Sequence, residues 1–119
     1  MGYRVVRDKE TFDKLHGGGK SAFLECSYPE LVGVLGEPSS VNRRGRRDEF
    51  WDDDSKVDVV WVVVAESGES LTIWNYKNGP AYNGGHGSLA DIWGFSVSAE
   101  SGSPLLQDIR DALAKPEDK

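Results

Sequence analysis

The sequence predicts a single α+β domain, in which an antiparallel sheet of about four strands carries helices on one face. Four runs have the composition of strands: residues 21–26, 57–65, 70–76 and 92–98. Three of them alternate apolar and polar residues. The second is almost wholly apolar and β-branched, as expected of a central strand covered on both faces. Helical patterns lie between and after these runs, and helices placed among antiparallel strands are typical of the α+β class.

The length and composition fit one domain. The chain has 119 residues, and we expect its core to span 20–114, with 1–19 and 115–119 at the periphery. Cys26 is the single cysteine, so an intramolecular disulfide is excluded, and no segment resembles a signal peptide or an 18-residue apolar span. We therefore expect a cytoplasmic protein. Fourteen basic against twenty acidic side chains leave a net charge of −6, which disfavours binding to long nucleic acids.

The clearest helix signal covers residues 28–35. Ser27 and Glu30 have the spacing of a capping box, in which each side chain accepts a hydrogen bond from the other residue's backbone N–H. Pro29 fits the first turn, where its missing N–H has no partner within the helix. Gly36 supplies the left-handed residue that ends many helices.

Two further helices are predicted at the ends of the chain. Asp8 is placed to cap a short helix over 9–15, which follows a short strand at 3–6. Ser103 is placed to cap a last helix that has Pro104 in its first position. The apolar residues of this last helix recur at helical spacing, so one of its sides is expected to pack on the sheet.

Two long polar segments, 37–56 and 78–91, are predicted as loops, and loops of this length in a compact domain are functional or mobile. Arginines gather in the first loop: Arg43, Arg44, Arg46 and Arg47. Acidic residues follow them: Asp48, Glu49, Asp52, Asp53 and Asp54. The arginines could hold an anion such as phosphate, or they could belong to a solvated loop. The neighbouring carboxylates favour the solvated loop, because they compete for the guanidinium groups.

The motifs of common enzymes and metal sites are incomplete. Residues 17–21 resemble the end of a phosphate-binding loop, but that motif needs a glycine where Lys14 stands, and a helix rather than a strand after it. The two histidines, His16 and His86, lack ligand-spaced partners, so no metal site is predicted. Cys26 shares the expected core side of its strand, where a thiol is usually inert. We therefore predict no catalytic residue, metal or cofactor.

The aromatic pattern of strand 70–76 is the most informative feature for function. Leu71 and Ile73 share one face, which we expect to be the core, so Thr72, Trp74 and Tyr76 are expected to point outward. Three more candidate binding residues follow: Lys77, Tyr82 and His86. Aromatic side chains on an open sheet face are typical of binding surfaces. The alternative is that a long loop folds over this face and buries them.

The other tryptophans are assigned by their surroundings. Trp61 and Trp93 lie in strongly apolar strand runs, so we expect both in the core. Trp51 lies in the charged loop and is either an anchor of that loop or a contact residue.

Three segments together resemble a group of small uncharacterised bacteriophage proteins: residues 27–38, 56–61 and 71–77, followed by Trp93-Gly94. Those proteins carry a Tyr-x-Glu-Leu-Val…Gly-x-Pro helix, a Trp-bearing strand, a Thr-Ile-x-x-Tyr-Lys strand and a late Trp-containing strand. The resemblance spans roughly residues 22–114 and contains no catalytic motif. The relatives tend to have a Trp-His-Ile-Gly-Gly-like segment where this chain has Trp93-Gly94-Phe95-Ser96, so any role of that histidine does not transfer.

A more distant, fold-level resemblance is to β-lactamase-inhibitor-like proteins. Their repeat unit is similar in its capped helix, which ends in Leu-Gly-x-Pro before an antiparallel meander, and members bind another protein on a concave sheet face. Both resemblances imply binding rather than catalysis. We therefore expect a non-enzymatic phage-type protein in the host cytoplasm that inhibits a host or anti-phage defence component.

Two other functions stay open on the sequence. The first is sequestration of a small nucleotide signal, in which aromatic side chains stack on the base while Lys77 and Arg43 or Arg44 hold phosphate. The second is an enzyme of unknown type, although no acid–base pair can be placed by spacing. An exposed aromatic sheet face would also fit the interface of a homodimer.

Overall fold

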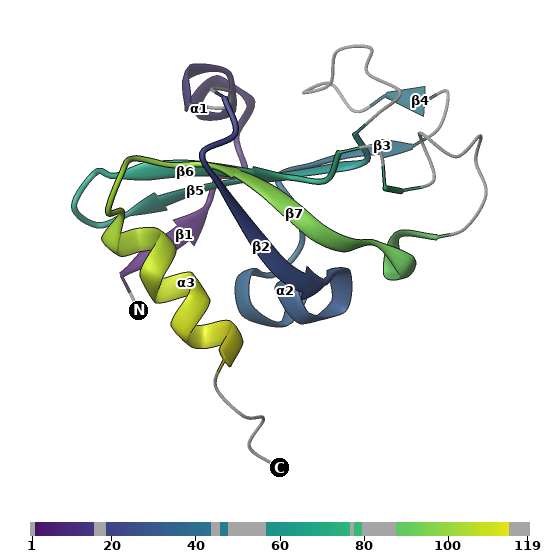
Figure 1. Cartoon of the computed structure of the whole chain (residues 1–119). Coiled ribbons are helices and arrows are strands. Elements are labelled where there is room, and N and C mark those ends of the chain that lie inside the picture. Colours follow the sequence, from purple (N-terminus) through teal and green to yellow (C-terminus); the bar gives the residue numbers. More distant parts are fainter. Residues whose placement is uncertain are drawn as a thin grey trace.

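The computed structural model describes residues 2–15, 19–43, 46–47, 57–76, 78–79 and 88–114 (Figure 1). Its strands are β1 (Tyr3–Val5), β2 (Ala22–Ser27), β3 (Ser40–Arg43), β4 (Arg46–Arg47), β5 (Val59–Ala65), β6 (Ser70–Trp74) and β7 (Trp93–Ser98). Its helices are α1 (Lys9–Leu15), α2 (Tyr28–Leu35) and α3 (Pro104–Ala114), with a 3₁₀ turn, η1, at Leu89–Asp91. The predicted α+β class with an antiparallel sheet is confirmed.

Within the described residues, the sheet has seven strands, rather than the four expected, in the order β2-β7-β6-β5-β3-β4, with β1 also paired to β5. All of the pairings are antiparallel. The four main strands predicted from the sequence are β2, β5, β6 and β7, and the short strand predicted at 3–6 is β1. Of the additional strands, β3 and β4 lie in the polar stretch 37–56, where no alternation of apolar residues marks a strand.

Strand β5 shares its outer edge between two partners. β1 pairs with its second half and β3 with its first half. Between them, the backbone of Val62 is satisfied by two other groups: the Val6 N–H donates to the Val62 carbonyl at 2.8 Å, and the Val62 N–H donates to the Ser39 hydroxyl at 3.0 Å. These hydrogen bonds give the Val62 N–H and carbonyl partners where neither β1 nor β3 pairs with β5. Backbone polar groups of a buried strand require such partners.

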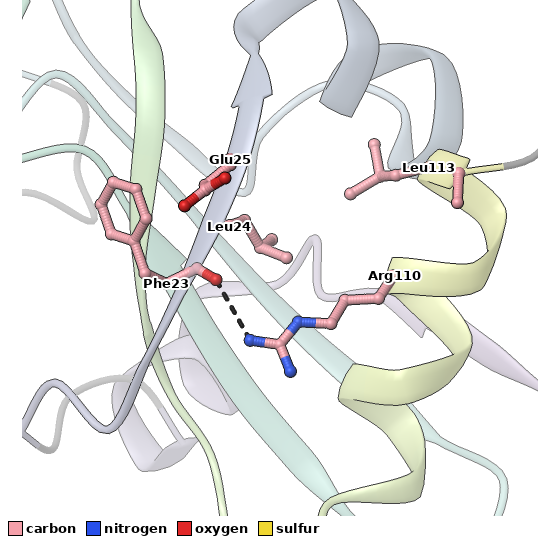
Figure 2. A pocket seen from close by; sticks show the side chains of 6 residues that line it. Phe23, Leu24, Glu25, Arg110 and Leu113 are labelled. Carbon is pink, nitrogen blue, oxygen red and sulfur yellow. Dashed lines mark hydrogen bonds between the residues drawn. The ribbon is translucent and has the colours of Figure 1, made fainter.

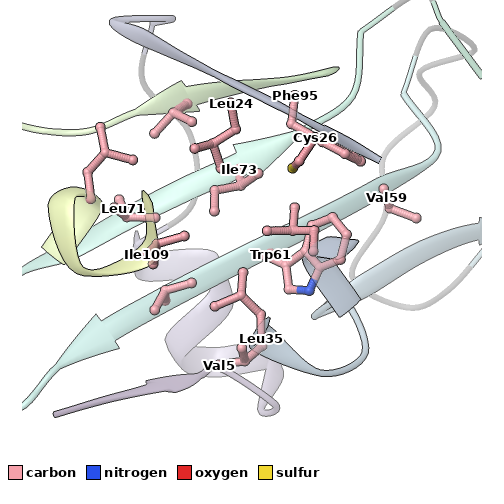
Figure 3. Close-up of a cluster of buried hydrophobic side chains, with 14 of the residues drawn as sticks. Val5, Leu24, Cys26, Leu35, Val59, Trp61, Leu71, Ile73, Phe95 and Ile109 are labelled. Carbon is pink, nitrogen blue, oxygen red and sulfur yellow. The ribbon is translucent and has the colours of Figure 1, made fainter. Parts of the chain in front are cut away.

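The main core lies between the sheet and the helices α2 and α3 (Figure 3). Trp61 of β5 is fully buried there, and its ring packs edge-on against Phe95 of β7 with ring centroids 5.5 Å apart. The Trp61 Nε1–H donates to the Gly36 carbonyl at 3.0 Å, just after the end of α2. The expectation that Trp61 belongs to the core is confirmed, and this residue also ties the end of α2 to the sheet.

The opposite face of the sheet carries a second, smaller core beneath α1. Phe12 of α1 is buried against Val60 and Val62 of β5. Figure 1 shows α1 on one side of the sheet, with α2 and α3 together on the other. Helices α2 and α3 thus share a face as expected, whereas α1 covers the other. The apolar run of β5 was expected to be covered on both faces, and both of its faces are indeed buried.

The helix caps follow the sequence signals closely. The Ser27–Glu30 capping box is present at α2. Asp8 accepts hydrogen bonds from the Thr11 N–H and hydroxyl at 2.9 and 2.6 Å, and these bonds lower the pKa of its carboxyl. At α3, the Ser103 hydroxyl accepts from the Leu106 N–H and itself donates to the Glu69 carboxylate. Glu69 belongs to the turn between β5 and β6, so it joins that turn to α3.

Cys26 provides a test of the core. It is buried in β2, and its burial, with Glu30 nearby, raises the pKa of the thiol from 9.0 to about 11. A disulfide reagent should therefore modify this thiol at pH 8 only after unfolding by denaturant. Because its pKa is raised on folding, the thiol's contribution to stability is complete below about pH 9 and declines as the pH rises toward 11.

The measurements are a thiol titration with and without denaturant, and unfolding curves across this alkaline range. Cys26→Ala is the control that should lack the alkaline decline. Rapid modification of the native protein, with its circular dichroism unchanged, would contradict the buried placement.

Candidate functional site

Most of the predicted binding residues lie outside the described residues. These are Arg44, Lys77, Tyr82 and His86, together with Trp51 and the side chain of Arg43. Of the predicted set, the structure places Trp74 and Tyr76. Trp74 is the last residue of β6, and Tyr76 follows two residues after it.

The expectation that Trp74 points outward on an open face is corrected. Trp74 is half-buried and packs against the second core, beside its cross-strand neighbour Val60. Thr72, on the same face, is buried. The physical reason is α1, which the sequence analysis did not place over this face. Tyr76 lies two residues further along the chain and is 49% exposed.

The expectation that Trp93 belongs to the core is wrong, since its side chain is 56% exposed. Phe95 and Val97 follow Trp93 at alternate positions and would share its face in a regular strand, yet both are fully buried. Gly94, between Trp93 and Phe95, has a φ of +95°, a left-handed conformation that interrupts the alternation of the strand. The pairing of β2 with β7 also shifts register between Leu24 and Ser27, opposite this point.

Gly94 forms the floor of a small aromatic region. A Cβ atom at this position would lie 2.7 Å from Cζ of Phe23, so the Phe23 ring sits directly over the glycine. Phe23 is 38% exposed. The pairing of β6 with β7 ends at Trp74 and Ser96, so Tyr76 and Gly94 each lie two residues beyond the same end of this ladder. We call three exposed aromatic residues at this end of the sheet the aromatic surface: Phe23, whose ring covers Gly94, Trp93, which precedes Gly94 in β7, and Tyr76, which follows the end of β6.

A buried polar network holds the backbone beneath this surface. The Asn75 side-chain oxygen accepts hydrogen bonds from the N–H groups of Asp58 and Val59 at 2.8 and 3.0 Å. The Asn75 amide nitrogen donates to the Asp58 carboxylate at 2.9 Å and to the Asn78 side-chain oxygen at 3.1 Å. Asn78 in turn donates to the carbonyls of Trp93 and Gly94 at 2.9 and 3.0 Å. Three strands, β5, β6 and β7, are thereby joined at one end of the sheet.

The packing around this network is close. Asn75 and Asp58 are buried, and a Cβ atom on Gly79 would lie 2.1 Å from the Asp58 carboxylate oxygen. The sequence analysis missed the network, although a signal was present. Asp58 stands alone within the apolar run Val57–Ala65, and a carboxylate is buried in such a place only when it has hydrogen-bond partners.

The described residues at this site offer exposed aromatic side chains and one nearby positive charge. Over the described parts of the chain, no three His, Cys, Asp or Glu side chains are placed to hold a metal ion. The described helices include none that is both long and apolar enough to cross a membrane. A positive charge does lie beside the aromatic surface, because the Lys20 ammonium is 4.8 Å from the centre of the Phe23 ring, within the range of a cation–π interaction.

From this network we expect that removing the Asn75 side chain lowers the stability of the fold more than removing the Asn78 side chain does. Asn75→Ala leaves two buried N–H groups without their acceptor, so we expect it to lower the free energy of unfolding by about 3 kcal/mol. Asn78→Ala is the matched control. Because Asn78 is less buried and water can replace its bonds, we expect a loss of about 1 kcal/mol. Urea unfolding of the three proteins measures both effects, and equal losses would contradict the central role of Asn75.

No model of a known protein family matches the chain, and a search of curated proteins finds no significant match.

Proposed function

We propose that this protein is not an enzyme and acts by binding another protein through its aromatic surface. The observation that carries the proposal is the exposure of Tyr76 and Trp93, at 49% and 56%, above a backbone held by the buried network. Large aromatic side chains supply contact area at low entropic cost, and they are enriched among the residues that dominate binding energy. A rigid floor adds to this, because little order has to be gained on binding.

The charge of the chain favours a partner with a basic patch. The net charge is −6, and complementary fields speed the encounter of two proteins. The resemblance to bacteriophage proteins extends the proposal to the kind of partner, namely a host or anti-phage defence protein in the host cytoplasm that this chain inhibits. Lys20, beside Phe23, would orient an acidic group at the rim of that contact.

A small nucleotide is the second candidate ligand, and the pairing of Lys20 with Phe23 is the observation that favours it. A base could stack on an exposed ring while the ammonium contacts phosphate, which combines the two interactions that nucleotide sites use. Against this, the proposed protein partner needs a broad contact and no enclosed pocket, which suits exposed aromatic side chains such as Tyr76 and Trp93.

The test is affinity purification of a tagged chain from the host cell extract, followed by calorimetry with the purified partner. We expect one stoichiometric partner, bound at least tenfold more weakly by the double variant Tyr76→Ser, Trp93→Ser. Leu15→Ser is the matched control, because Leu15 is a similarly exposed apolar residue on α1. It should bind as the wild type does.

Calorimetry with a panel of cyclic nucleotides separates the two ligands. A one-to-one signal at micromolar or tighter affinity would overturn the protein-only proposal. Unchanged partner affinity in the double variant would show that the aromatic surface is not the contact. All variants are expected to keep the wild-type melting temperature, since both replaced side chains are exposed.

A further inference from the structure

A groove separate from Tyr76 and Trp93 runs between β2 and α3. Figure 2 shows one part of it, a hollow of about 400 Å³ lined by Phe23, Leu24, Glu25, Arg110, Leu113 and Ala114. A second hollow, of about 780 Å³, is lined by the start of β2 and the first turns of α3. Arg110 lines both hollows, so its guanidinium stands between them.

The wall that β2 contributes is the edge of the sheet. Strand β2 is the last in the order of the described strands and pairs on one side with β7. The Phe23 carbonyl accepts a hydrogen bond from Arg110 Nη2 at 3.1 Å, so it points toward the groove and away from β7. The N–H and the carbonyl of one residue in an antiparallel strand point to the same side. The Phe23 N–H therefore also faces the groove, where another strand could pair with it.

Arg110 gives the groove a charge preference. A guanidinium carries five N–H donors in a planar fork that suits a carboxylate, whereas the hydrogen bond seen for Arg110 is to a neutral carbonyl. Among the described residues, no carboxylate lies within ion-pair distance of it. Glu25 lines the first hollow and Glu100 the second. The groove is thus positive at its centre and negative to either side.

We propose that this groove binds an extended peptide segment of a partner, which adds to β2 as a further antiparallel strand and places one carboxylate on Arg110. Strand addition at a sheet edge takes its affinity from backbone hydrogen bonds and its specificity from side chains that enter neighbouring hollows. The peptide that matches this groove has an Asp or Glu at its centre. Its neighbours on either side are apolar or basic, because Leu24 and Leu113 line the first hollow and Glu25 and Glu100 would repel further acids.

The probe is a displayed library of random linear 12-residue peptides, selected on the immobilised chain. We expect the selected peptides to share a central acidic residue, and a synthetic copy to bind at least tenfold more weakly to Arg110→Glu and also more weakly to Arg110→Gln. Replacing the central acid of the peptide by lysine should restore its binding to Arg110→Glu. Arg4→Gln, a change at an exposed arginine on β1, is the matched control and should leave the affinity unchanged.

Two further readouts test the strand geometry. N-methylation of the peptide at alternate positions should abolish binding, and the amide proton of Phe23 should become protected from exchange when the peptide is bound. The proposal is overturned if no peptide is enriched, if the selected peptide binds Arg110→Glu with wild-type affinity, or if N-methylation has no effect. It is also overturned if the double variant at Tyr76 and Trp93 abolishes peptide binding, because the peptide would then lie on the aromatic surface.

Discussion

The arrangement of the sheet depends on the side chain of Asn75. This buried amide accepts from the backbone at the start of β5, donates to Asp58, and reaches β7 through Asn78. A side-chain amide is suited to this position because it can accept and donate at once. Leaving such groups unpaired in the interior would cost more than the bonds contribute when made. The network therefore fixes the register of β5, on which both cores are built.

The features that could be predicted from the sequence are those with local signals, as strand β5 and the helix caps show. Its continuous apolar run indicates burial on both faces, and the caps at Ser27, Asp8 and Ser103 mark the helices, because these signals are local. Which face each helix covers is not a local property. Trp74 was expected on an open face, because the alternation of β6 shows two faces and does not show that α1 returns over one of them. The short strands β3 and β4 were missed because their pairing is not local: β3 pairs with β5, and β4 pairs with β3.

The sequence predicted that an aromatic surface would be exposed, but it identified only some of the residues that form it. Tyr76 follows from alternation, but Trp93 does not, because the left-handed conformation of Gly94 turns the strand where a regular pattern would continue it. That conformation is supported from outside the strand, by Asn78 on the two carbonyls and by the Phe23 ring above. Phe23 and Asn78 lie far from Gly94 in sequence. Their convergence is a result of folding that no periodicity in one strand reveals.

Phe23 is the point at which the two proposed binding sites meet. Its ring covers Gly94 within the aromatic surface, while its backbone faces the groove and Arg110. The ring and the backbone leave the strand in different directions, so one residue serves a sheet face and a sheet edge. A partner that pairs with the edge at Phe23 would thus hold the residue whose ring covers Gly94 in the neighbouring aromatic surface. An extended segment and a folded surface of the same partner could then occupy the two sites together, with the gain in affinity that linkage gives.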